Sequence, residues 1–128
     1  MNMSKLPIIL EQFENSLTQF GAVLAMEKNP IVRDSAIKRF EIALDLSWKA
    51  AKAFLKERKG EDCNFPKDCV RKAFQAGLIG YDDEWITLID LRNNSTHIYN
   101  ETFADDLFGK LPHAQKLFLE LLKNLKTL

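Results

Sequence analysis

Apolar residues recur along this chain in steps of three and four, which is the spacing of one face of an α-helix. The first such stripe predicts a helix from about Ser4 to Lys28. It ends at the segment "EKNP", because Pro30 disfavours helical backbone at the residue before it. The stripe consists of Leu6, Leu10, Phe13, Leu17, Phe20 and Leu24.

The same spacing predicts two more helices in the middle of the chain. One runs from about Arg33 to Lys59, with Asp34 as a candidate cap and Gly60 as a stop. A short one begins at Pro66, which suits a first helical turn, and is closed at Gly77. We expect the loop between them to be brief.

Two long helices complete the pattern. One starts near Asp82, and the last spans about Phe103 to the C-terminus, where Pro112 should kink it or restart it after Gly109. No stretch alternates as a strand would. The pattern therefore predicts an all-α fold, a four-helix up-and-down bundle with one extra short helix, as a single domain over residues 1–128.

Composition narrows the class of protein. The nine Phe and two Trp residues are spaced for a helical core. Eighteen basic residues balance eighteen acidic ones, so any nucleic-acid contact must be local. No apolar run approaches the roughly 20 residues that span a bilayer. The opening "MNMSKLPIILEQF" lacks a signal-peptide pattern, so we expect a cytoplasmic protein without membrane contact.

The two cysteines and two histidines do not suggest a metal site. Cys63 and Cys69 are six residues apart, whereas redox motifs have two intervening residues and structural zinc needs four ligands. We predict reduced thiols on or near the short helix, and no metal or cofactor. His113, beside the predicted kink, is expected to be a surface residue.

The first helix carries more apolar residues than one face can hold. Ile8, Ile9 and Val23 lie off its main stripe. One bundle cannot bury all of them if the terminal helices are apolar on several sides, so we expect a dimer or another partner.

The segment Leu91–Glu101, "LRNNSTHIYNE", departs from the pattern. The helix that starts near Asp82 has an apolar stripe, and its continuation would require apolar side chains at certain positions. Those positions are occupied by Arg92, Ser95 or Thr96, and Tyr99. Several polar residues at adjacent positions where the helical pattern requires apolar ones indicate a functional cleft on a continuing helix. The alternative is that the helix ends near Leu91 and a solvated loop follows.

On a continuing helix, this polar run would bring some of its side chains together. Asn93 and His97 are one turn apart and can touch. Arg92 and His97 are five residues apart, roughly 140° around a regular helix, so they would not stack directly.

These residues resemble a known family. "RNNSTHIY" is similar to the Arg-x4-His-x-Tyr signature of HEPN domains, and more narrowly to the branch encoded beside minimal nucleotidyltransferases, known as nucleotidyltransferase substrate-binding proteins. The segments "RFEIALDLSWKAAKAFL" and "RKAFQAGLI" also resemble that branch. The three segments cover about a third of the chain and favour the helical interpretation of the polar run.

The resemblance implies a bundle that forms a homodimer, in which the Arg-x4-His elements of two subunits line a shared cleft. In active members this cleft cleaves RNA without a metal. The matching catalytic positions here are Arg92, Asn93 and His97. Tyr99 matches the tyrosine that the partner nucleotidyltransferase, an antitoxin, adenylylates to silence the toxin.

Four further residues are candidates for lining the cleft. Glu41, Asp45 and Lys49 match family positions in the second segment, and Thr96 lies within the motif itself. A charged residue on a bundle helix is more often simply solvated, so their role stays open here.

The residue types suit cleavage of RNA. A neutral imidazole at His97 can take a proton near pH 7, and the guanidinium of Arg92 fits two phosphate oxygens. RNA rather than DNA is expected because the 2′-OH is the nucleophile. Two alternatives are a non-catalytic subunit that binds a nucleotide or substrate for a nucleotidyltransferase, and a plain helical adaptor without a ligand.

Overall fold

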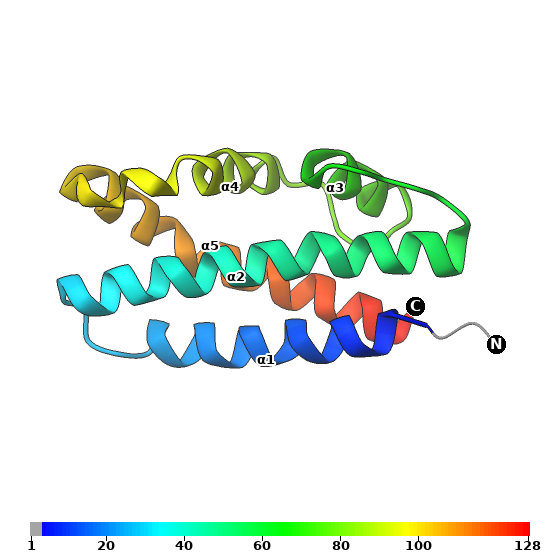
Figure 1. The fold of residues 1–128 in the computed structure, drawn as a ribbon, viewed down its shortest axis with the longest axis horizontal. Coiled ribbons are helices and arrows are strands. Elements are labelled where there is room, and N and C mark those ends of the chain that lie inside the picture. The colour runs from blue at the N-terminus through cyan, green and yellow to red at the C-terminus, as the bar shows by residue number, and fades with distance from the viewer. Residues whose placement is uncertain (1–3) are drawn as a thin grey trace.

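The computed structural model describes residues 4–128 as helices packed side by side (Figure 1). α1 and α2 are antiparallel neighbours, α3 and α4 follow one another along one side, and α5 returns to the end where the chain begins. No strand occurs within residues 4–128, which confirms the predicted all-α bundle. The elements are α1 (Leu6–Leu24), α2 (Pro30–Phe54), the π-turn η1 (Leu55–Lys59), α3 (Pro66–Gln75), α4 (Glu84–Asn93), the 3₁₀ turn η2 (Ser95–Tyr99) and α5 (Glu101–Thr127).

Aromatic rings from four helices meet at the centre of the core. Phe118 of α5 lies 6.2 Å from the ring of Phe40 and 5.6 Å from that of Trp85. Phe13 and Phe20 of α1 contact it from the other side. All five side chains are at most 1% exposed, so the predicted stripes do form one core.

Asparagine side chains begin the two longest helices. The Asn29 side chain accepts a hydrogen bond from the Val32 amide at 2.8 Å, and Asn100 does the same for Phe103 at 3.1 Å. The prediction that Asp34 caps the second helix was therefore wrong, since the helix starts at Pro30. Proline fits that first turn because its missing N–H would have no helical partner there.

The two predicted glycine stops are confirmed. Gly60 (φ 65°) follows η1 and Gly77 (φ 79°) follows α3, and both have the left-handed backbone that side chains disfavour.

Pro112 does not restart the last helix, which runs unbroken from Glu101 to Thr127. The prediction of a restart after Gly109 was wrong. The physical reason is packing: Leu111 and Ala114 on either side of the proline are fully buried, while Pro112 itself faces outward. Loss of one backbone hydrogen bond does not outweigh that burial.

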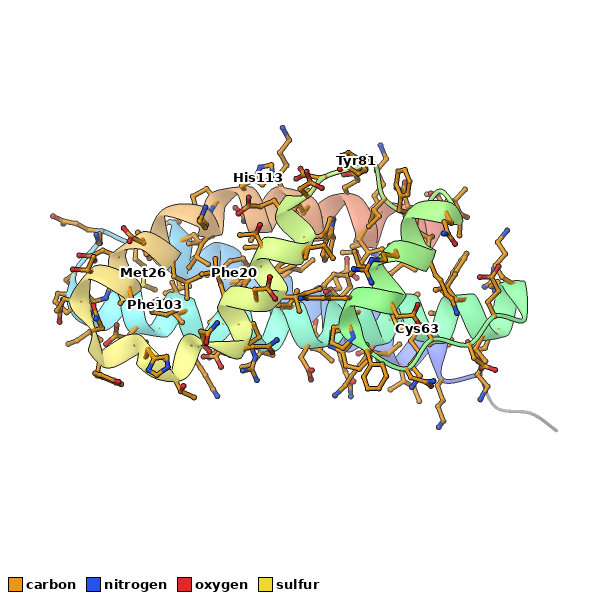
Figure 2. All side chains as sticks on the ribbon, turned by 90° about the horizontal axis from the view of Figure 1, so that it is seen from above. Phe20, Met26, Cys63, Tyr81, Phe103 and His113 are labelled. Atoms are coloured by element: carbon orange, nitrogen blue, oxygen red, sulfur yellow. A yellow bond between two sulfur atoms is a disulfide. The ribbon has the colours of Figure 1, made fainter. Side chains whose placement is uncertain are left out.

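The prediction of free thiols was also wrong, because Cys63 and Cys69 form a disulfide. The loop after Gly60 folds back so that the two Cα atoms lie 5.2 Å apart, and both side chains are buried against Leu55. A spacing of six residues fits no redox motif, so the sequence alone did not indicate this bond. Figure 2 shows Cys63 toward the end of the bundle opposite Phe103.

The apolar residues of α1 that lie outside its main stripe differ in burial. Val23 is buried and Ile9 is half-buried, whereas Ile8 stays 58% exposed. Dimerisation therefore stays a prediction. No helix within residues 4–128 combines the length and the apolar content needed to cross a membrane.

One guanidinium is buried where α2 and α5 begin. Arg33 is only 4% exposed, and it donates hydrogen bonds to Glu101 at 2.6 Å, Asp34 at 2.9 Å and Asp105 at 3.3 Å. The bond from Arg33 lowers the pKa of Glu101, and bonds from Lys28 and then Arg33 lower the pKa of Asp105. This cluster fixes the first turn of α5, directly after η2.

We predict that Arg33→Met lowers the melting temperature at pH 7, and that the difference from the wild type narrows as pH falls toward 3. Carboxylates whose pKa is lowered in the folded state contribute stability above their ordinary pKa, about 4. That contribution is lost as acid protonates Glu101 and Asp105 in the folded protein. Thermal melts followed by circular dichroism at several pH values measure the difference.

Lys38→Met is the matched control, because it removes an exposed positive charge from the same helix. A difference between wild type and Arg33→Met that is constant from pH 7 to pH 3 would contradict the role of this cluster.

Candidate functional site

The polar run adopts neither of the two predicted forms. α4 ends at Asn93, and residues Ser95–Tyr99 then form a 3₁₀ turn before α5 begins. The interpretation as a continuing α-helix was wrong, and so was that as a solvated loop, since Ser95 is only 4% exposed. The segment is helical but has a break after Asn93.

Polar side chains produce this break by bonding to the backbone at the end of α4. The Ser95 hydroxyl donates to the carbonyl of Arg92 at 2.8 Å, and the Asn94 amide donates to the carbonyl of Asp90 at 2.9 Å. Such bonds compete with helical ones and are why Ser and Asn favour helix ends. The next helix then starts afresh at its own cap, Asn100.

The side chain of Arg92 points back to α2. Its Nη1 lies 3.5 Å from Oε2 of Glu41, and the two side chains are 42% and 20% exposed. The guanidinium has five N–H donors, so this contact leaves others for a ligand. Glu41 thus holds Arg92 in place beside α2 without occupying it fully.

A small cavity opens beside Arg92, between α2, the start of α3 and the end of α4. We call it the Arg92 pocket, and its volume is about 150 Å³. Its walls are formed by four apolar side chains together with a carboxylate, a guanidinium and an amide. The lining residues are Leu44, Asp45, Trp48, Pro66, Ile89, Arg92 and Asn93.

Lys49 contacts two of the residues that line this pocket. Its Nζ lies 2.8 Å from Oδ2 of Asp45 and 5.8 Å from the centre of the Trp48 ring. Glu41, Asp45 and Lys49 are spaced four residues apart on α2, so they share one face of that helix. The structure therefore brings these three candidates and Arg92 to the same region.

His97 and Tyr99 form a second cluster on η2. Nδ1 of His97 lies 3.1 Å from the hydroxyl oxygen of Tyr99, and the imidazole also meets the edge of the Phe103 ring. Tyr99 is 79% exposed, and Thr96 is exposed next to this pair. Phe103 marks this end of the bundle in Figure 2.

Within one chain the two clusters do not join. Among the hydrogen bonds and ion pairs of residues 4–128, none connects Arg92 or Asn93 to His97. The break at the end of α4 separates Asn93 from His97, which a regular helix would place one turn apart. The one-turn spacing expected for Asn93 and His97 on a continuing helix is therefore not present, and no hydrogen bond joins them within the described residues.

Sequence analysis missed two residues of the Arg92 pocket. Trp48 was assigned to the core by its spacing, and Pro66 only to the start of α3, yet both line the cavity. Trp48 is three residues from Asp45, so the two lie on the same face of the helix. This spacing could have placed Trp48 at the candidate site. His113 lies on the surface as predicted, 2.9 Å from Asp82 (Figure 2).

No group of three or more His, Cys, Asp or Glu side chains in the described part of the chain is arranged to hold a metal ion. The polar groups of the candidate site are the imidazole of His97, the phenol of Tyr99, the amide of Asn93, the guanidinium of Arg92 and the carboxylates of Glu41 and Asp45. This set can exchange protons and bind phosphate oxygens.

Comparison with known proteins assigns the family. An all-helical bundle with an Arg-x4-His element that begins in the last turn of α4 and ends on η2 is that of a HEPN-like protein. The chain belongs to the family described as "Nucleotidyltransferase substrate binding protein like", whose model matches residues 8–127. The match covers the whole bundle and both clusters of the candidate site.

Individual relatives agree with this assignment. Over 120 residues the chain is 27% identical to a Haemophilus influenzae protein named "Probable ribonuclease HepT", covering 87% of this chain and 82% of the relative. A crystal structure of a Thermus thermophilus protein is 33% identical with a TM-score of 0.82, over 89% of this chain and 98% of that one.

A second solved structure, from Haemophilus influenzae, shares the fold with a TM-score of 0.70 and 24% identity, over 98% of this chain and 99% of that one. It is described as the fold of a substrate-binding domain of a nucleotidyltransferase.

Proposed function

We propose that this protein is the RNA-cleaving subunit of a pair whose other member is a minimal nucleotidyltransferase. The observation that carries the proposal is the hydrogen bond between His97 and Tyr99 on an exposed turn that follows Arg92 and Asn93. It joins a residue suited to general-base catalysis to a hydroxyl that a transferase can reach. The relative named a ribonuclease supports the same activity.

The proposed reaction is transfer of a phosphodiester to the neighbouring ribose hydroxyl. His97 takes the proton of the 2′-OH, whose oxygen then bonds to phosphorus while the bond from phosphorus to the 5′-oxygen breaks. The proton returns to the leaving oxygen directly or through water. The products are a 2′,3′-cyclic phosphate and a 5′-hydroxyl, so no metal or cofactor is needed to balance the step.

Tyr99 orients the base in this proposal. If Nδ1–H of His97 donates to the Tyr99 oxygen, the lone pair of Nε2 is free to accept the proton from RNA. The Phe103 ring, nearly perpendicular to the imidazole with its centre 6.5 Å away, is a second neighbour that restricts it. An imidazole held by two neighbours would keep one tautomer and one direction.

Arg92 supplies the positive charge. Its free N–H donors would bind the two non-bridging phosphate oxygens and stabilise the charge that grows on them in the transition state. Glu41 would keep the side chain extended toward the cleft. Asn93, on the same pocket, would hold the ribose or the phosphate through its amide.

A second subunit would complete the site. Because Arg92 and His97 do not meet within one chain, a homodimer with these elements facing each other would place four such side chains around one phosphate. Exposed apolar side chains near this end of the bundle are available for a partner. One of them is Ile31, in the first turn of α2, which is 81% exposed. The partner transferase would bind the same dimer.

We predict that the metal-free protein cleaves single-stranded RNA in the presence of a chelator. His97→Ala should lower the rate by about 10²–10⁴-fold because the general base is lost. Arg92→Ala should lower it by about 10²–10³-fold because charge stabilisation is lost. Initial rates on a labelled RNA measure both effects.

His113→Ala is the matched control, since it removes the other histidine from a similarly exposed position. It should cleave at the wild-type rate. Equal cleavage by wild type, Arg92→Ala and His97→Ala would mean a contaminating nuclease and would remove the proposal.

The proposed partner would silence the subunit by adenylylation. The Tyr99 oxygen attacks the α-phosphorus of ATP, pyrophosphate leaves, and the hydroxyl proton passes to solvent. The added adenylyl group is bulky and negatively charged. It would lie beside His97 and close to the proposed phosphate site of Arg92. It would exclude RNA phosphate by repulsion and by competition for the guanidinium.

We predict that a minimal nucleotidyltransferase partner adds one adenylyl group at Tyr99 and abolishes cleavage. Tyr99→Phe should accept no group. Its own rate should be lower than that of the wild type, because the hydrogen bond to His97 is lost, but it should not fall further when the transferase and ATP are added. Tyr81→Phe is the control, because the chain has two tyrosines of nearly equal exposure, 75% and 79%. Mass spectrometry locates the group, and its attachment to Tyr81 would contradict this mode of silencing.

The second candidate is a subunit that binds a nucleotide or substrate for the transferase without cleaving RNA. The separation of the Arg92 pocket from the His97–Tyr99 cluster favours it, because a pocket can bind a ligand without a base nearby. Nucleotide binding that is lost in Arg92→Ala, with no cleavage by the wild type, would favour this candidate.

A further inference from the structure

We propose that the Arg92 pocket binds the guanine base of single-stranded RNA, on the 5′ side of the phosphate that is cleaved. This inference rests on the proposed function, and it adds the class of substrate. The pocket combines apolar side chains with a carboxylate, a guanidinium and an amide, so it can hold a flat ring and also form hydrogen bonds with its edge.

The volume of the pocket limits what it can hold. Sites for drug-sized ligands measure about 300–1,000 Å³, whereas this one is about 150 Å³. One flat ring system would fit, but a whole nucleotide would not. Trp48 and Pro66 offer flat apolar surfaces for stacking, which is how proteins hold single-stranded bases.

The polar groups favour guanine over the other bases. A carboxylate only accepts hydrogen bonds, and Asp45 presents one to the pocket. Guanine offers two adjacent donors, N1–H and the N2 amino group. Adenine and cytosine place an acceptor beside their amino group, and uracil flanks its single N–H with two carbonyls. The amide of Asn93 would donate to O6 of guanine.

Asp45 is available for this contact. Its side chain is 46% exposed, and within residues 4–128 its hydrogen bond to Lys49 uses Oδ2. Each carboxylate oxygen has two lone pairs, so both oxygens can still accept from a base. Lys49 also offsets the negative charge of Asp45, which would otherwise repel the RNA backbone.

The position of Arg92 relates the base to the cleaved bond. Arg92 belongs both to the pocket and to the proposed phosphate site. A guanine in the pocket would therefore place its own 3′-phosphate within reach of the guanidinium. The expected cleavage is on the 3′ side of guanosine.

Binding of the four 3′-mononucleotides to the full-length protein tests this inference by calorimetry. We expect 3′-GMP to bind at least about fivefold more tightly than 3′-AMP, 3′-CMP or 3′-UMP, the lower end of what one bidentate contact discriminates. The Asp45→Asn variant should lose this preference for 3′-GMP. The control is Asp90→Asn, which removes a carboxylate of similar exposure from the adjacent helix, outside the pocket. This control should retain the preference for 3′-GMP.

Cleavage of oligoribonucleotides with one guanosine in a run of adenosines is the second measurement, with thermal melts to confirm that each variant is folded. Equal binding of the four nucleotides, or a guanine preference that survives in Asp45→Asn, would overturn the inference. Cleavage without base preference would also overturn it while sparing the proposed function. A guanine preference in binding, lost in Asp45→Asn, with no cleavage of any RNA would support the inference and remove the proposed activity.

Discussion

Phe118 contacts aromatic rings from α1, α2 and α4, and this single side chain fixes how the helices of the bundle pack. Trp85 holds the start of α4 against it, and Ile89 is the last buried apolar residue of that helix. Beyond Ile89 no side chain of α4 is fully buried, although Leu91 still packs against the core. The candidate site therefore lies at the edge of the core.

The charged side chains near the site pair with one another in the unliganded protein. Arg92 contacts Glu41, and Lys49 contacts Asp45. These pairs are partly exposed, so each contributes little to stability. The pairs hold a guanidinium and a carboxylate in the wall of one pocket, where a ligand could replace their present partners. A strongly basic surface is not required for such local recognition.

Much of the fold could be predicted from the spacing of apolar residues, since the stripes and the glycine stops follow directly from helix geometry. The break after Asn93 could not, because it depends on where the Ser95 and Asn94 side chains find backbone acceptors. The disulfide also escaped prediction, because it depends on a loop folding back in three dimensions. At the site, the motif provided the candidate residues Arg92, Asn93, His97 and Tyr99, whereas the positions of Trp48 and Pro66 in the cavity wall follow only from the three-dimensional structure.

In the proposed reaction the ribose 2′-OH of RNA is the nucleophile, and the imidazole on η2 activates it. Replacing this hydroxyl by hydrogen at the one cleaved position of a defined oligoribonucleotide tests this step. We expect the unmodified strand to yield a 2′,3′-cyclic phosphate and a 5′-hydroxyl, and the modified strand to stay intact at that bond. Cleavage of the modified bond, or products that carry a 5′-phosphate, would contradict the proposed reaction.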